Sequence, residues 1–136
     1  MRTKNFSITE VAHRPITPDL IPHAAAAMQH LQTIRDQASK HFGRDIPIRI
    51  TSGYRELAYN RSLKSKDTSY HIWRTEDRLL WAVDFEPLNI GVEEFWDWYK
   101  HIVTGERYYH SGNKDRNIRP FIHTAPNGVD KTPWRV

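Results

Sequence analysis

The sequence predicts an α+β fold in which a small central antiparallel sheet is packed by helices. Residues 27–42 and 92–103 repeat apolar side chains at the three- and four-residue steps of an amphipathic helix. Residues 46–51 and 79–85 are short and rich in β-branched or apolar residues, as strands are. A chain of 136 residues, 38% of them hydrophobic, has room for one core, so we expect a single domain over residues 1–136.

The first part of the chain is expected to hold an arm, a long helix and a strand. Residues 5–16 indicate an irregular arm, because Pro15 opposes a long helix. Thr17-Pro18-Asp19 is a typical helix start, and the apolar pattern that follows runs to Gly43, a typical helix end. The alternation in residues 46–51 then predicts a strand that ends at the Ser52-Gly53 turn.

The later elements are shorter. Residues 56–63 predict a short helix, which places Arg55 at a junction between strand and helix. The apolar segments 71–74 and 79–85 flank a polar stretch and predict a hairpin with a four-residue loop, whose second strand is central in the sheet. After the helix at 92–103, two short strand candidates lie around a polar loop, at residues 107–109 and 120–124.

Composition restricts the chemistry that is available. The chain has no cysteine, so metal binding is left to His, Asp and Glu, and folding needs no oxidising compartment. No apolar run approaches the roughly 20 residues that cross a bilayer, so we expect no membrane insertion. The net charge of +4 and a pI near 9.5 permit attraction to an anionic polymer, either nucleic acid or bacterial wall, without choosing between them.

Three side chains far apart in the sequence, His71, Asp84 and His123, form a candidate metal site. Two imidazoles and a carboxylate are a ligand set that holds a catalytic zinc ion and leaves its fourth position open. A carboxylate at the buried end of a strand also needs a compensating partner, such as a metal. The alternative for Asp84 is an aspartate that caps a strand end or pairs with Arg55, and eight histidines can place some in suggestive positions by chance.

The order of short motifs in the chain resembles one family. Ile50-Thr51-Ser52-Gly53-Tyr54-Arg55 is followed by Ser69-Tyr70-His71, then by Ala82-Val83-Asp84, and last by Phe121-Ile122-His123. This order is similar to that of zinc D-Ala-D-Ala carboxypeptidases and peptidoglycan endopeptidases, here called zinc DD-peptidases, and especially to small single-domain members, including phage endolysins. The likeness covers nearly the whole chain. It implies the fold shared by DD-peptidases and Hedgehog domains, with one Zn²⁺ per chain bound by His71, Asp84 and His123.

The chain departs from the pattern of that family in two ways. His71 and Asp84 have twelve residues between them, where members usually have six. If the extra residues form a hairpin, the metal geometry survives, whereas an odd shift in strand register would turn Asp84 to the other face of the sheet. The acidic residue that many members have three positions before the last His is Pro120 here, and the aspartate that small relatives often have two positions after it is Ala125.

The resemblance implies hydrolysis of a peptide bond in the peptidoglycan stem peptide, by a carboxypeptidase or an endopeptidase. Zinc lowers the pKa of a bound water from about 15.7 towards about 7. Asp115 or His110 is then the candidate that takes the water proton and returns it to the leaving amine, with Glu106 also in the preceding segment. Arg55 corresponds to a substrate-binding arginine, whose guanidinium suits a carboxylate or an oxyanion, and the alternative is a structural ion pair with Asp84 or Glu86.

Two other functions fit parts of the sequence. A metal-free peptidoglycan-binding module of the same fold would explain the wide ligand spacing and Pro120. A nucleic-acid-binding domain would explain the pI and the Trp73-Arg74 and Trp134-Arg135 pairs, but no recognised nucleic-acid motif is present, so we expect no nucleic-acid partner. We expect a monomer. The N-terminus lacks the apolar segment of a secretory signal, so we expect synthesis in a bacterial cytoplasm and action on the wall after phage-type release.

Overall fold

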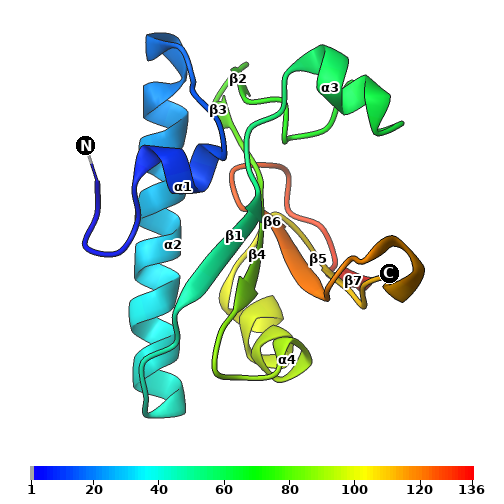
Figure 1. Cartoon of the computed structure of the whole chain (residues 1–136). Coiled ribbons are helices and arrows are strands. Elements are labelled where there is room, and N and C mark those ends of the chain that lie inside the picture. Colours follow the sequence, from blue (N-terminus) through cyan, green and yellow to red (C-terminus); the bar gives the residue numbers. More distant parts are fainter. Residues whose placement is uncertain (1) are drawn as a thin grey trace.

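The sheet of the computed structural model has five strands in the order β1-β4-β6-β5-β7 (Figure 1). The structure describes residues 2–136, so Met1 of the expected domain lies outside it. The strands are β1 (Ile48–Ser52), β4 (Val83–Pro87), β5 (Glu106–His110), β6 (Phe121–Ala125) and β7 (Trp134–Arg135). Neighbouring strands are antiparallel except β5 and β7, which are parallel. The predicted α+β class is confirmed, and the two-residue β7 makes the sheet mixed.

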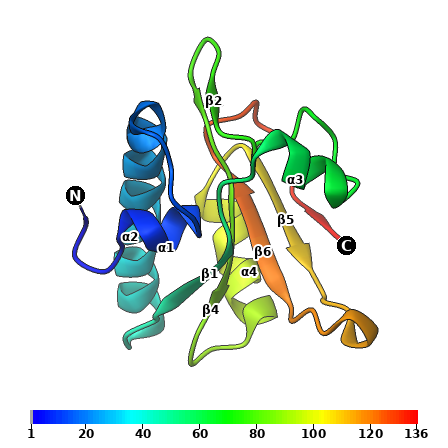
Figure 2. The same cartoon turned by 45° about the horizontal axis from the view of Figure 1, so that its top comes forward.

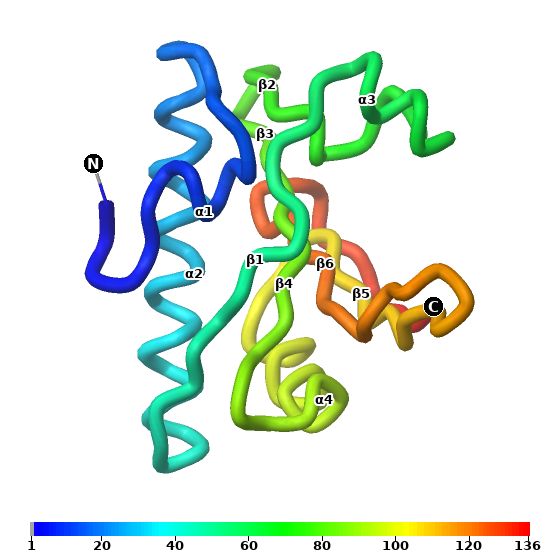
Figure 3. Tube along the Cα trace, in the orientation of Figure 1, coloured from blue at the N-terminus to red at the C-terminus, as the bar shows by residue number. Residues whose placement is uncertain are grey.

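Helices pack on this sheet and leave part of it open. They are α1 (Ile8–Ala12), α2 (Ile21–Phe42), α3 (Leu57–Ser62) and α4 (Val92–Ile102), with short 3₁₀ turns η1 (Pro18–Leu20) and η2 (Lys114–Arg116). The long α2 runs along one side of the molecule, and α1 crosses in front of it (Figure 3). Within residues 2–136 no helix has the length and apolarity needed to cross a bilayer.

The two faces of the sheet differ because side chains alternate along each strand. On one face, Ile50, Phe85 and Ile122 enter the core with side chains of α2 and α4, such as Phe95. The neighbouring residues in β4 and β6 point the other way, and they include Asp84 and His123. The helices therefore supply the core for one face, and polar residues are left on the other.

Two sequence expectations need correction. The arm at residues 5–16 contains helix α1, because Ser7 and Glu10 form a reciprocal capping box at its start. The expected strand over residues 79–85 is interrupted between β3 (Leu79–Leu80) and β4. The indole Nε1 of Trp73 donates to the carbonyl oxygen of Ala82 at 3.1 Å, and this bond holds the chain where the strand breaks.

The additional residues between the first two candidate ligands form a protruding hairpin, visible at the top of Figure 2. In this hairpin β2 (Arg74–Thr75) pairs with β3 in an antiparallel register. The other predicted helices and strands are present with boundaries shifted by a few residues, and α2 ends at Gly43 in the left-handed conformation (φ 70°).

Candidate metal centre

Three predicted metal ligands converge on one point. Asp84 in β4 and His123 in β6 are directly paired across neighbouring antiparallel strands, so their side chains leave the same face of the sheet together. His71 approaches from the segment that precedes the hairpin. Its Nε2 lies 3.1 Å from Oδ1 of Asp84, and Nδ1 of His123 lies 2.9 Å from the same oxygen. One ligand atom from each residue lies within 4.8 Å of the others, and all three residues are buried.

The strand-to-helix junction at Ser52–Arg55 fixes the orientation of His71. The carbonyl oxygen of Gly53 accepts a hydrogen bond from Nδ1 of His71 at 2.8 Å, so Nε2 is the nitrogen left to bind a metal. The backbone N–H of Arg55 donates to the carbonyl oxygen of His71 at 2.8 Å, and Oγ of Ser69 accepts from the His71 N–H at 3.2 Å. The serine two positions before His71 therefore positions the backbone of the ligand.

Glu106 in β5 fixes the orientation of His123. Its Oε1 lies 2.7 Å from Nε2 of His123, and its Oε2 accepts from Nζ of Lys131 at 2.8 Å. The Glu106 carboxylate accepts a hydrogen bond from Nε2–H of His123, and the other ring nitrogen, Nδ1, then faces Asp84. Metal-bound histidines in proteins commonly donate their second ring N–H to a carboxylate or a carbonyl in this way. Both histidines fit that pattern, so the donor set suits a divalent cation such as zinc.

The electrostatics of the site agree with this arrangement. Burial by itself raises the pKa of Asp84, but the neighbouring His71 and the hydrogen bonds of His123 and His71 outweigh burial and hold the pKa well below its usual range. Burial lowers the pKa of His123, and hydrogen bonds to the Asp84 and Glu106 carboxylates reverse this and raise it to about 9. Both shifts have the same cause, which is the close contact of the histidine rings with the Asp84 and Glu106 carboxylates, and a bound cation would be stabilised by these carboxylates in the same way.

Arg55 reaches the same site from the edge of the sheet. One terminal nitrogen of its guanidinium lies 3.8 Å from Oδ2 of Asp84, and hydrogen bonds to Asn60 and Ser52 hold the side chain. Its Nε is buried and has no hydrogen-bond partner among the described residues. Of the two structural ion pairs expected as alternatives for Arg55, the pair with Asp84 is present, whereas Glu86 pairs with Arg49 and Arg119 instead.

A cleft of about 730 Å³ opens beside the three ligands. Its wall includes Arg55, Tyr70, Glu106, Tyr108 and Trp134. Tyr108 stacks on the ring of His123 with centroids 4.6 Å apart, and Trp134 packs on Tyr108 in turn. The short β7 thus contributes an aromatic residue to the wall of the cleft.

The two predicted proton-transfer residues lie outside the wall of that cleft. His110 ends β5, stacks on Phe121 with centroids 4.8 Å apart, and accepts the backbone N–H of Gly112 on Nδ1 at 2.9 Å. Asp115 is exposed in η2. Glu106 is the acidic residue that contacts a ligand directly, and the register that brings it there is not visible in the sequence.

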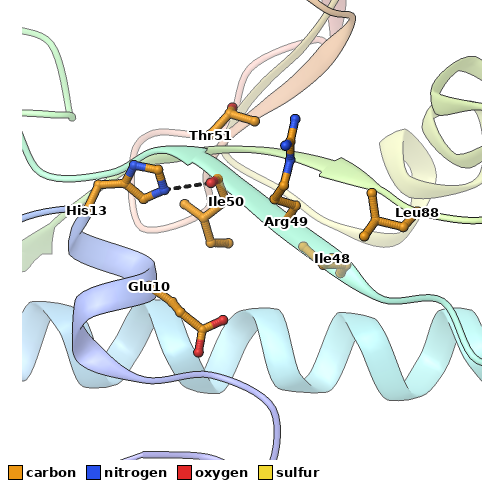
Figure 4. A pocket seen from close by; sticks show the side chains of 7 residues that line it. All are labelled: Glu10, His13, Ile48, Arg49, Ile50, Thr51 and Leu88. Atoms are coloured by element: carbon orange, nitrogen blue, oxygen red, sulfur yellow. Dashed lines mark hydrogen bonds between the residues drawn. The ribbon is translucent and has the colours of Figure 1, made fainter.

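A second hollow, of about 660 Å³, lies on the outer side of β1 beside α1 (Figure 4). His13 Nε2 lies 2.6 Å from the carbonyl oxygen of Ile50 there. Arg49 and Thr51 point away from α2 in this view, whereas Ile50 is on the α2 side. None of the candidate metal ligands lines this hollow.

Two imidazoles and a carboxylate that converge beside an open cleft are typical of the metal site of a metalloenzyme. Residues 3–124 match the family described as Peptidase M15. The chain therefore belongs to the Peptidase M15 family, a metallopeptidase family of the zinc D-Ala-D-Ala carboxypeptidase type, which confirms the resemblance seen in the sequence. No curated protein and no solved structure matches the chain in the corresponding comparisons.

Proposed function

We propose that the protein is a zinc peptidase that hydrolyses a peptide bond in the stem or cross-link of bacterial peptidoglycan, acting as a single-domain monomer. The observation that carries the proposal is the shared approach of His71 Nε2 and His123 Nδ1 to one oxygen of Asp84 at the wall of the cleft. These three residues would hold one Zn²⁺. When bound, zinc supplies Lewis-acid activation of water and of the substrate carbonyl near neutral pH.

The residues around the ligands would bind the substrate and move protons. Arg55 lines the cleft with a terminal guanidinium nitrogen 3.8 Å from Oδ2 of Asp84, and a guanidinium there suits a substrate carboxylate or a developing oxyanion. His110 accepts on Nδ1, so its neutral ring carries the proton on Nε2, from which it can pass to a leaving amine. Asp115 is the other proposed proton acceptor, although it is more exposed than His110.

Glu106 has a different role in this proposal. Burial raises its pKa, but hydrogen bonds from His123 and Lys131 outweigh burial and lower the pKa to about 2. This carboxylate is therefore ionised at neutral pH, and in that form it accepts the hydrogen bond from Nε2 of His123 that orients the ring. We therefore assign Glu106 to positioning His123, and its substitution serves as a comparison for those of His110 and Asp115.

The proposal is tested by clearing of purified peptidoglycan with and without a chelator, together with metal analysis of the protein. We expect about one zinc per chain, clearing that stops in chelator, and recovery on addition of Zn²⁺. Asp84→Asn should lose both metal and clearing, whereas Asp97→Asn, at an exposed site on α4, should retain both. Clearing that persists in chelator would refute the metal mechanism. A protein that binds peptidoglycan without metal and without clearing would instead be the binding module.

Proton-transfer roles are tested by the pH dependence of kcat in zinc-loaded variants. Loss of a general acid or base typically costs about 10²–10⁴-fold in rate. We expect a loss of that size for His110→Gln, with zinc content unchanged. Asp115→Asn should cost as much if Asp115 takes the proton, and almost nothing if it is only an exposed loop residue.

A further inference from the structure

A smaller hollow continues from the cleft across the open face of the sheet. Its volume is about 410 Å³, and it shares Arg55, Asp84 and Phe121 with the cleft. Two more arginines line it, Arg49 from β1 and Arg119 from the loop before β6. We call this hollow the arginine groove. Its wall thus combines three guanidinium groups with one carboxylate, Asp84, which the metal site uses.

Glu86 holds the two additional arginines in place. It lies two residues after Asp84 in β4, is 2% exposed, and therefore sits at the base of the same face. Its Oε1 lies 2.5 Å from a terminal nitrogen of Arg49, and its Oε2 lies 3.1 Å from Nε of Arg119. Both carboxylate oxygens are thereby used. Arg49 and Arg119 keep exposed side chains, with 55% and 72% of their surface accessible.

The groove has more donors than acceptors. A guanidinium has five N–H donors, and Arg49 and Arg119 each use one nitrogen on Glu86. Within residues 2–136 neither guanidinium makes another hydrogen bond or ion pair, so the remaining N–H groups of Arg49 and Arg119 are free on the exposed side of the groove. Three positive groups face two carboxylates, one of which belongs to the metal site. The remaining donors suit an anion that can accept two parallel hydrogen bonds, as a carboxylate does.

We propose that the arginine groove binds a free carboxylate of the peptide substrate, about two residues from the bond that is cut. The distance follows from the strand, because Glu86 is two positions after Asp84 in β4 and each position adds roughly 3.4 Å, which is the span of about two extended substrate residues. The proposal rests on the proposed peptidase function and adds a specificity to it: a peptide with the free acid is preferred over the same peptide with a carboxamide.

The test uses two synthetic stem peptides that differ at one position, D-isoglutamate in one and D-isoglutamine in the other. Dissociation constants are measured for the full chain with zinc chelated, so that both peptides stay intact, and KM and kcat are measured for the zinc-loaded protein. The variant is Arg119→Ala. The matched control is Arg116→Ala, which removes an exposed arginine of the same loop that does not line the groove. Thermal unfolding of each variant checks folding.

We expect the wild-type protein to bind the acid peptide about tenfold more tightly than the amide, because the hydrogen bond is charge-assisted. Arg119→Ala should lose most of that ratio and raise KM for the acid peptide alone, with kcat almost unchanged, and Arg116→Ala should keep the ratio. Higher salt should reduce the ratio in the wild type. Equal binding of the two peptides, or an Arg119→Ala variant that keeps the ratio, would overturn the subsite. Selective binding without cleavage would overturn only the peptidase function.

Discussion

Oε1 of Glu106 lies 2.7 Å from Nε2 of His123, and the strand register explains how the two side chains meet. Glu106 in β5 is paired with Ala125 in β6, two residues beyond His123 on the same face. The Glu106 carboxylate and the His123 ring therefore lie on one face of neighbouring strands, where they meet. Lys131 binds the other oxygen of that carboxylate, so a continuous chain of hydrogen bonds runs from Lys131 to Asp84.

The first prediction concerns this chain of contacts. Glu106→Ala should weaken zinc binding about 10–100-fold, because the ring of His123 loses the partner that fixes its tautomer and orientation. Glu106→Gln should weaken it less, since an amide oxygen can still accept the Nε2 proton. Competition with a chromogenic chelator measures the affinity, and the Co²⁺ absorption spectrum reports the ligand geometry. Glu93→Ala, which breaks an exposed ion pair with Arg135, should leave both unchanged. An unaltered affinity in Glu106→Ala would contradict the positioning role.

A second prediction concerns Gly53, whose carbonyl oxygen holds His71. A Cβ at this position would collide with the backbone oxygen of Val11 and lie 2.8 Å from the backbone of Ala12. Gly53→Ala should therefore destabilise the protein by about 1–3 kcal/mol, as overpacking does, and should also weaken metal binding by displacing His71. Gly91→Ala is the control, because its Cβ would meet nothing nearer than 4.0 Å. Equal unfolding midpoints for the two variants would rule out this account.

A third prediction follows from His30 in α2, which lies outside the metal site. Nε2 of His30 is 2.9 Å from the hydroxyl of Tyr99, and burial lowers the His30 pKa to about 4. The folded state therefore disfavours the charged His30 ring. The neutral ring contributes its full free energy of unfolding above pH 6.5, and this contribution is lost as the pH falls towards 4. We expect His30 to contribute about 2 kcal/mol to the free energy of unfolding. This is less than the full pKa shift implies, because the ring is only partly buried.

Denaturant unfolding of the metal-free protein at pH 7 and pH 4.5 measures the effect of His30. Wild type should lose more free energy of unfolding between these two pH values than His30→Gln does. The carboxylates with lowered pKa titrate below this range and are common to both proteins, so the difference between the two proteins isolates His30. The same loss in both proteins would show that another group is responsible.

The sequence predicted the ligands better than the residues that support them. His71, Asp84 and His123 have local motifs around them, and the structure brings them together. Glu106 has no such motif, since its contact with His123 depends on which residues of β5 and β6 pair. The groove formed by Arg49 and Arg119 was missed for the same reason: Glu86 joins two arginines 70 positions apart in the sequence. Short helices and strands such as α1 and β7 were missed because they have few residues in which to show a period.

The last prediction concerns the twelve residues between His71 and Asp84. The face on which Asp84 lies is set by pairing of β4 with β6, where Asp84 is opposite His123, and the Trp73 indole fastens the base of the hairpin to Ala82. The length of the hairpin should therefore not matter to the site. Replacing Thr75–Leu79 with Asn-Gly, a two-residue type I′ turn, shortens the connection by three residues, an odd number. Zinc affinity should stay within about threefold of wild type.

The free energy of unfolding of the shortened protein should be about 1 kcal/mol lower, because the hydrogen bond between Thr75 and His23 is lost. Thr75→Ala alone measures that hydrogen bond separately. Loss of zinc in the shortened protein but not in Thr75→Ala would mean that the hairpin, and not the pairing of β4 with β6, positions the carboxylate.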